Sequence, residues 1–136
     1  MLVISALDRR ILYLSHTFVG TVHDFSMLKT VLPPQKNWFG QFEVRLDLGF
    51  QGFADLYKCK QLYIPQKKPR KSDLTEQQKQ ENKEQASQRV VVEHSIGGLK
   101  RYRFLSDRLR CHDDKLYNRI AGVCAALWNY HIMLSC

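Results

Sequence analysis

Two carboxylate side chains stand at positions where a folded chain could use them for metal-dependent chemistry. The first is Asp47, which ends a stretch where Phe42, Val44 and Leu46 alternate with polar residues, as they would in a β-strand. Gly49 follows, so the chain turns directly after the aspartate. Strand ends are where α/β folds assemble binding and catalytic sites. The alternative interpretation is an aspartate that only hydrogen-bonds to the following turn.

The second carboxylate, Glu93, lies among apolar residues, because Val90–Val92 precede it and Ile96 follows it. An isolated carboxylate in such surroundings is costly unless a partner compensates its charge. On a helix, Arg89 lies about 40° from Glu93, and Lys100 lies between them at about 20°. One interpretation of this stripe is an ion pair between residues four apart, with a nearby surface lysine. The other is a metal-binding carboxylate whose flanking cations hold a scissile phosphate.

The chain carries a formal net charge of +8, most of it in the second half. Residues 1–60 hold 7 Lys and Arg against 5 Asp and Glu, a surplus of 2, and residues 61–136 hold 14 against 8, a surplus of 6. This balance predicts contact with a polyanion, either nucleic-acid phosphates or an anionic membrane surface, and the alternative is a solvated charged face. The candidate phosphate contacts are Lys67, Lys68, Arg70 and Lys71, followed by Lys100, Arg101, Arg103, Arg108 and Arg110.

The elements that must position these residues are strands first and long helices last, which predicts an α/β fold. A hairpin is expected over Met1–Ala6 and Ile11–Thr17, with its turn at Asp8–Arg10. A short helix opens after it and ends at Pro33-Pro34. Two further strands are expected at 42–46 and 62–64. A helix is expected from Asp73 to Arg103, with an Asp73/Glu76 capping box at its start and a break at Gly97-Gly98. The last expected element is an amphipathic helix from Asp113, whose apolar residues are Leu116, Ile120, Val123, Leu127, Tyr130 and Leu134.

Other residue patterns make several classes of protein poor candidates. The last apolar stretch, Ile120–Cys136, contains Asn129 and His131 and is better interpreted as a buried helix than as a membrane span. No secretory leader is expected at the start of the chain. The four cysteines have neither zinc-site nor redox spacing, so reduced thiols are expected; they are Cys59, Cys111, Cys124 and Cys136.

Three segments in order carry a family resemblance: Thr21–Ser26, Asp47–Gly52, and Arg89–His94 continuing through Gly98–Arg101. They resemble the successive motifs of DDE transposases of bacterial insertion sequences and of the related PIF/Harbinger elements. The resemblance implies a ribonuclease-H-like (DDE integrase-like) fold. It also implies two aspartates and a glutamate that bind two divalent cations, Mg²⁺ or Mn²⁺, for in-line displacement at phosphorus in double-stranded DNA.

The resemblance places the second aspartate of the family on Asp47 and its glutamate on Glu93, with Arg89 and Lys100 as supporting cations. It implies DNA contact by Lys100, Arg101 and Arg103 and by the earlier cluster Lys67, Lys68, Arg70 and Lys71. His23-Asp24 has two interpretations, a cap that opens the short helix and a direct role in metal binding, and the cap is preferred.

The chain also departs from the family pattern. The first aspartate of the family lies on a strand upstream of the His-Asp segment, and this chain begins about one strand later, so truncation at the N-terminus is expected. Asp8 is a poor substitute because it lies in the expected hairpin turn, and Ala86 stands where related enzymes often carry tyrosine.

These observations set the remaining expectations. Residues 1–110 should form a partial catalytic domain, with a C-terminal helix over 111–136 packed on it. The complete enzyme should act on transposon ends, as a homodimer, in the bacterial nucleoid or the eukaryotic nucleus. The isolated chain should be inactive. The alternative function is that of an inactive DNA-binding remnant of a transposase.

Overall fold

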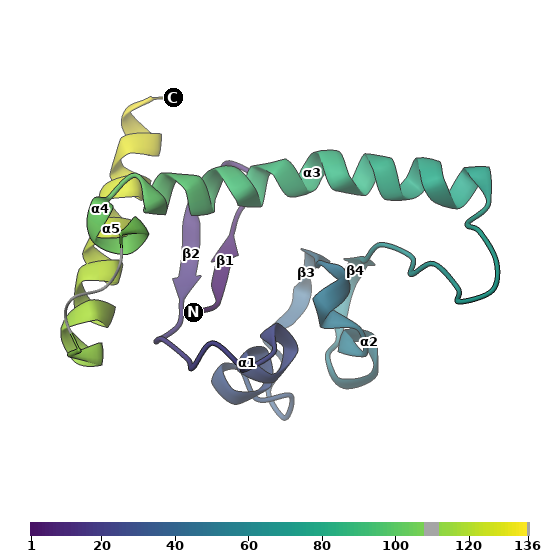
Figure 1. Cartoon of the computed structure of the whole chain (residues 1–136), viewed down its shortest axis with the longest axis horizontal. Coiled ribbons are helices and arrows are strands. Elements are labelled where there is room, and N and C mark those ends of the chain that lie inside the picture. The colour runs from purple at the N-terminus through teal and green to yellow at the C-terminus, as the bar shows by residue number, and fades with distance from the viewer. Residues whose placement is uncertain (108–111, 136) are drawn as a thin grey trace. The chain divides into compact units, whose positions relative to one another are not determined.

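The computed structural model describes residues 1–107 and 112–135. The chain divides into two compact units, one built from Met1–Val19 and Val90–Cys136 and the other from Gly20–Arg89. Each unit contains one two-stranded sheet and helices, so the expectation of an α/β chain is confirmed (Figure 1). None of the described helices is long and apolar enough to cross a membrane.

The first unit opens with the expected hairpin. Strands β1 (Val3–Ser5) and β2 (Ile11–Leu14) pair antiparallel, with an irregular register after Ile4. Arg9 takes a positive φ of 73° in the turn. The carboxylate of Asp8 accepts hydrogen bonds from the Arg10 backbone N–H (3.0 Å) and Nε (2.6 Å), and these bonds lower the pKa of Asp8. Asp8 is therefore occupied in closing the turn.

Helix α5 (Asp114–Leu134) packs on this hairpin, beside the end of helix α3 (Glu76–Lys100) and the short helix α4 (Arg103–Ser106). Asp113 begins α5 as expected, because its side chain accepts hydrogen bonds from two backbone N–H groups, those of Lys115 (2.9 Å) and Leu116 (3.2 Å). The core of the unit is made of Ile11, Leu99, Cys124, Ala125, Trp128 and Ile132.

Polar side chains tie α5 and α3 to the hairpin backbone. Asn129 accepts a hydrogen bond from the Ile11 N–H (2.7 Å) and donates one to the Ile11 carbonyl (2.8 Å), as a neighbouring strand would. The Trp128 indole N–H (2.9 Å) and the fully buried Ser95 hydroxyl (3.0 Å) both donate to the Arg9 carbonyl. Three side chains from the later helices thus fix the turn and the first residue of β2.

Two sequence-based expectations about these helices are wrong. Helix α3 runs without a break through Gly97 and Gly98. Gly98 lies against the Trp128 ring, where a Cβ would overlap the ring, so a glycine is needed there for close packing. The apolar stripe marked in the C-terminal helix, which includes Leu127, is mostly exposed. The face of α5 that packs is instead Ala121, Cys124, Ala125, Trp128 and Ile132, whose small members let the helix approach closely.

The second unit contains helix α1 (Asp24–Val31), then strands β3 (Phe39–Arg45) and β4 (Cys59–Tyr63), which pair in parallel. A 3₁₀ turn η1 (Leu48–Phe50) and the short helix α2 (Phe53–Leu56) connect the two strands. The buried apolar residues of this unit are Met27, Leu28, Leu32, Phe53 and Tyr57.

The buried residues of this unit hold the connection between its strands in place. The Phe53 and Tyr57 rings stack at 4.8 Å, and the Tyr57 hydroxyl donates to the Leu32 carbonyl (2.6 Å) after α1. Burial raises the pKa of Tyr57, which keeps its donor proton in place. Both rings also contact the ring of Phe39, the first residue of β3, with centroid distances of 5.5 Å from Phe53 and 5.7 Å from Tyr57.

Helix α3 begins later than the sequence suggested. The capping box is formed by Thr75 and Gln78, since the Gln78 N–H donates to the Thr75 hydroxyl (3.3 Å) and the Thr75 N–H donates to the Gln78 side chain (3.0 Å). Asp73 does not open the helix and instead forms an ion pair with Lys68 in the preceding loop.

Candidate functional site

Asp47 lies directly after strand β3, where the sequence placed it. It is the N-cap of η1, and its Oδ1 accepts a hydrogen bond from the Leu48 N–H at 2.7 Å. This confirms that Asp47 hydrogen-bonds to the turn that follows it. The same oxygen also accepts a hydrogen bond from Nη1 of Arg89 at 3.1 Å, 42 residues later in the chain. Two residues from separate motifs thus meet in one unit.

The ion pair between Asp47 and Arg89 lies at the surface. The side chain of Asp47 is 45% exposed and that of Arg89 is 52% exposed. Water screens such a pair, so its contribution to stability is about 0–1 kcal/mol. An exposed carboxylate held at a strand end remains accessible to a hydrated cation or to a phosphate-bound one.

The segments Thr21–Ser26 and Asp47–Gly52 pack against each other in this unit. The Phe25 and Phe50 rings approach edge to face at 6.5 Å, and Gly49 leaves room for the Asp24 carboxylate, which would lie 3.6 Å from a Cβ at that position. Gly52 has a φ of 88°, a conformation that glycine adopts without strain. The order of these segments could be read from the sequence, whereas their contact could not; the two glycines were the only signal of it.

His23 occupies the N-cap position of α1, as the preferred interpretation expected. Its backbone is extended and its side chain makes no capping hydrogen bond, so the cap rests on the backbone alone, with the Met27 N–H bonded to the His23 carbonyl at 3.0 Å. Asp24 is the first residue of the helix, where a negative charge interacts favourably with the helix dipole.

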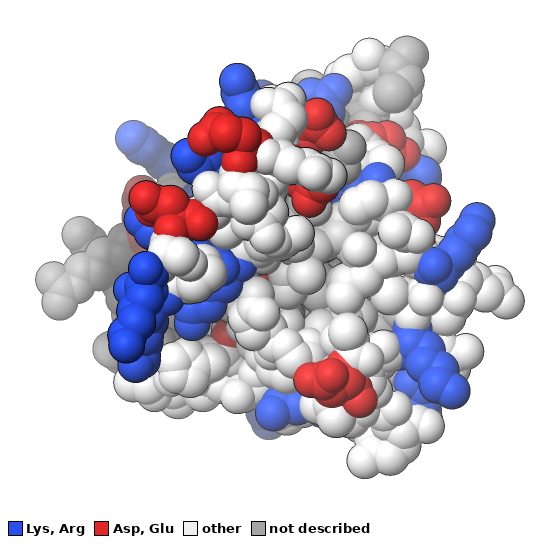
Figure 2. All heavy atoms as spheres, turned by 90° about the vertical axis from the view of Figure 1, so that its right-hand side faces the viewer, with Lys and Arg blue, Asp and Glu red and all other residues white. Residues whose placement is uncertain are grey.

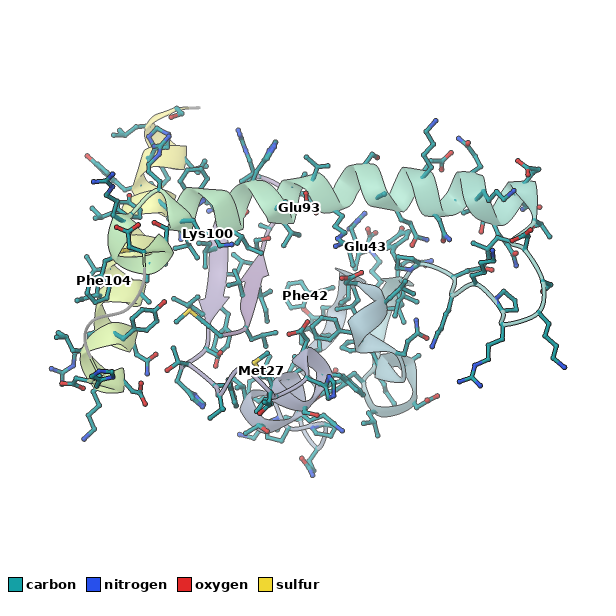
Figure 3. All side chains as sticks on the ribbon, in the orientation of Figure 1. Met27, Phe42, Glu43, Glu93, Lys100 and Phe104 are labelled. Atoms are coloured by element: carbon teal, nitrogen blue, oxygen red, sulfur yellow. The ribbon has the colours of Figure 1, made fainter. Side chains whose placement is uncertain are left out.

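Glu93 and Lys100 lie on α3 within the other unit, and both are exposed (Figure 3). The buried residues of this part of α3 are Ser95, Gly98 and Leu99, on the opposite side of the helix from Glu93. The expectation that Glu93 sits in an apolar environment is therefore wrong, because its apolar sequence neighbours project from other sides of the helix.

The carboxylates have the ligand chemistry of the divalent cation that the resemblance implies. Asp47 and Glu93 supply the hard oxygen donors that Mg²⁺ and Mn²⁺ prefer, and both are accessible to solvent. Within residues 1–107 and 112–135, no three side chains of His, Cys, Asp or Glu form a group that could hold a metal ion. The donor chemistry of the two carboxylates fits a divalent cation, but two carboxylates are fewer than the three that the resemblance implies.

The first basic cluster occupies the loop between β4 and α3. Lys67, Lys68, Arg70 and Lys71 are all exposed, and a shallow polar hollow is lined by Lys68, Arg70, Lys71, Ser72 and Asp73. Figure 2 shows Lys and Arg side chains interspersed with Asp and Glu on one face of the molecule. On that face the cations do not form a continuous basic patch.

The second basic cluster lies where α3 ends and α4 begins. Lys100, Arg101 and Arg103 are exposed, and the Arg101 guanidinium lies over the Trp128 ring, 5.9 Å from its centroid. That contact restrains the side chain beside the core of its unit. Arg108 and Arg110 lie outside the described residues.

Two comparisons with known proteins find matches over nearly the whole chain. Residues 1–129 match the family model described as DDE superfamily endonuclease. The chain is 31% identical over 133 residues to a Microchaete diplosiphon protein named "Probable transposase for insertion sequence element IS702". That alignment covers 98% of this chain and 46% of the relative, so the chain spans about half the length of the curated relative. No solved structure matches the chain. On this evidence the chain belongs to the family of DDE superfamily endonucleases.

Proposed function

We propose that the chain is part of a transposase catalytic domain, and that the complete enzyme cleaves and transfers DNA strands with the aid of divalent cations. Family membership and the name of the relative support a role in transposition. The observation that carries the proposal is the contact between Asp47 and Arg89, because it joins two of the three motif segments at the end of a strand.

In this proposal Asp47 and Glu93 hold Mg²⁺ or Mn²⁺, with further coordination from water, DNA and another carboxylate. The bound ion would supply Lewis-acid polarisation of the phosphate and a more acidic attacking water or 3′-hydroxyl. Arg89 neutralises Asp47 at 3.1 Å in the absence of an ion, so a cation arriving at Asp47 competes with it. The guanidinium and the Lys100 ammonium are then the groups that bind phosphate oxygens.

The two basic clusters extend this proposal to the DNA backbone. Lys100, Arg101 and Arg103 belong to the same unit as Glu93 and are exposed, so they can contact phosphates that flank the scissile one. The loop carrying Lys67, Lys68, Arg70 and Lys71 supplies a second, separate group of cations. Such contacts place a protein on DNA without reading its sequence, and they fit work in the nucleoid or nucleus.

The element order supports a ribonuclease-H-like fold for this domain. An antiparallel pair, a helix and then a parallel pair follow one another along the chain, and α5 packs on β2. A two-stranded sheet is marginal by itself, so each of the two sheets would gain from a further strand along an open edge. In this arrangement 1–110 belong to the catalytic domain and the helix within 111–136 is part of its packing.

A second candidate is a remnant that binds DNA without metal-dependent chemistry. It is favoured by the lack of a three-ligand cluster in the part of the chain that the structure describes. In a remnant the exposed cations would still bind phosphate, whereas Asp47 would only cap its turn and pair with Arg89.

Manganese titration followed by NMR separates the two candidates, because Mn²⁺ broadens the signals of nuclei close to it. The transposase proposal expects broadening of backbone signals around residues 47 and 93 of the 136-residue chain. It expects that broadening to weaken in both Asp47→Asn and Glu93→Gln. Glu84→Gln, which removes another exposed carboxylate from α3, serves as the matched control and should leave the pattern unchanged.

The remnant predicts a different outcome. Weak broadening spread over all surface carboxylates, equally insensitive to the three substitutions, would contradict the proposed metal site. DNA binding measured on the same samples would then identify the remnant, provided that Glu93→Gln binds DNA as well as the unaltered chain does.

A further inference from the structure

Helix α5 carries a second apolar face that the core does not use. Large apolar side chains recur at alternating steps of four and three along the helix. They are Leu116, Ile120, Val123, Leu127, Tyr130 and Leu134. At about 100° per residue, all six fall within a stripe about 80° wide, and its centre lies about 130° around the helix from the centre of the buried face formed by Ala121, Cys124, Ala125, Trp128 and Ile132.

We call these six positions the seam. Ile120 is partly buried against the core, and the other five are exposed. The exposed fraction is 59% for Val123, 48% for Leu127, 60% for Tyr130 and 67% for Leu134. Isolated exposed apolar residues are normal on a protein surface, but a contiguous row of this length marks an interaction surface.

The spacing of the seam identifies the kind of partner. Apolar residues at steps of four and three have an average period of 3.5, the heptad pattern of two helices that wind around each other. Ile120, Leu127 and Leu134 take one core position of the heptad, and Leu116, Val123 and Tyr130 take the other. A partner helix with the same repeat would match the seam along its whole length, and the same helix of a second copy has that repeat.

Charge and area also favour a second copy. Between Leu116 and Leu134 the only charged residue is Arg119, so two seams meet without rows of opposed like charges. A two-fold axis would bring the stripe onto itself. Six partly exposed side chains of this size on each copy would remove on the order of 1,000 Å² from water, which reaches the range of specific interfaces. We propose that the α5 seam is a homodimer interface.

Sedimentation velocity or light scattering of the intact 136-residue chain tests this proposal. The expected result is a concentration-dependent shift towards twice the 16.0-kDa chain mass at micromolar concentrations. Leu127→Glu and Val123→Glu each place a carboxylate in the middle of the seam. Either should weaken the dimer roughly a hundredfold or more, because a buried unpaired carboxylate is strongly disfavoured.

The matched control is Gly122→Glu, which adds the same charge to an exposed position of the helix, outside the seam and with no atom within 4 Å of the new Cβ. It should dimerise like the unaltered chain. Circular dichroism of all variants establishes that the helices remain folded. A chain that stays monomeric at ~100 μM would overturn the proposal. The proposal would also be overturned if Leu127→Glu and Val123→Glu had the same dimer dissociation constant as Gly122→Glu. The result does not depend on metal binding at Asp47 and Glu93.

Discussion

Asn129 and Asn118 both bind the backbone of the first segment through their side-chain amides. Asn129 makes two hydrogen bonds to Ile11, whereas the Asn118 carbonyl oxygen accepts one from the Thr17 N–H at 3.0 Å. Both contacts join residues more than a hundred positions apart in the sequence. Single side chains therefore secure the N-terminal hairpin to α5, and each can be removed separately.

Substituting these asparagines should destabilise the chain in proportion to the bonds lost. Asn129→Ala leaves a part-buried N–H and a carbonyl without partners, so we expect a loss of about 2–3 kcal/mol in the free energy of unfolding. Asn118→Ala removes one bond and should cost about 1 kcal/mol. Urea unfolding followed by circular dichroism measures both. Equal effects of the two substitutions would contradict the two-bond role of Asn129.

Arg89 offers a residue-scale prediction that follows from the proposed metal site. Arg89→Gln removes the cation that occupies Oδ1 of Asp47, so Mn²⁺ should bind more tightly, by about two- to tenfold. Lys79→Gln removes an exposed cation from the same helix and is the control. Calorimetric titration with Mn²⁺ compares the two variants. Weaker binding in Arg89→Gln would mean that Arg89 orients Asp47 for the ion rather than competing with it.

Helix α3 shows at the scale of an element how adjacent glycines can have opposite effects. Gly97 faces open space, whereas Gly98 lies flat against the Trp128 ring. The sequence presents them as a pair of helix breakers. In the folded unit, the absence of a side chain at Gly98 allows α3 and α5 to approach closely.

The two glycines should therefore respond in opposite ways to alanine. Gly98→Ala forces the Trp128 ring or the helix to move, and we expect a loss of about 1–3 kcal/mol in stability. Gly97→Ala should stabilise the chain by up to about 1 kcal/mol, because alanine favours the helix. Thermal unfolding of both variants provides the comparison. If both substitutions stabilised the chain, the Trp128 ring would have to move away from a Cβ at position 98 at little cost in free energy.

Patterns among neighbouring residues predicted most helices and strands, but they could not predict contacts between segments that are far apart in the sequence. The turn at Asp8 and the start of α5 at Asp113 follow from side chains that bond their own neighbouring backbone. The position of Asp47 after a strand follows from alternation. The partner of Arg89 could not be found this way, because it lies 42 residues away.

The packed face of α5 was also beyond local pattern. Hydrophobicity ranks Leu127 and Leu134 above Ala121 and Ala125, and this ranking predicts that the more hydrophobic stripe is the buried one. The core instead uses the face where small residues let Trp128 and Ile132 reach the hairpin. Shape complementarity decided the packing, and a helix with two apolar faces offers no sequence signal that separates them.

At the scale of the whole molecule, the net charge of +8 predicts DNA binding that weakens steeply with salt. Neutralising Lys100, Arg101 and Arg103 together, as Gln, should reduce the slope of log K against log salt by up to about 3, near one per phosphate contact. Fluorescence anisotropy with duplex DNA at several salt concentrations measures the slope. The control replaces three other exposed lysines with Gln: Lys58, Lys60 and Lys83. Equal slopes for both triple variants would assign the binding to overall charge alone.

The division of the chain also bears on the order of its folding. The second unit, Gly20–Arg89, is continuous, whereas the first unit is interrupted by these 70 residues and resumes at Val90 within α3. During synthesis the hairpin leaves the ribosome long before Trp128 and Asn129 exist to hold it. At usual elongation rates this interval is on the order of ten seconds, long enough for the inserted unit to fold first. During that time the edges of β1 and β2 can pair with other chains. Slower synthesis of residues 20–135 is therefore expected to increase aggregation. Once α5 has been synthesised and packs on the hairpin, this source of aggregation is removed.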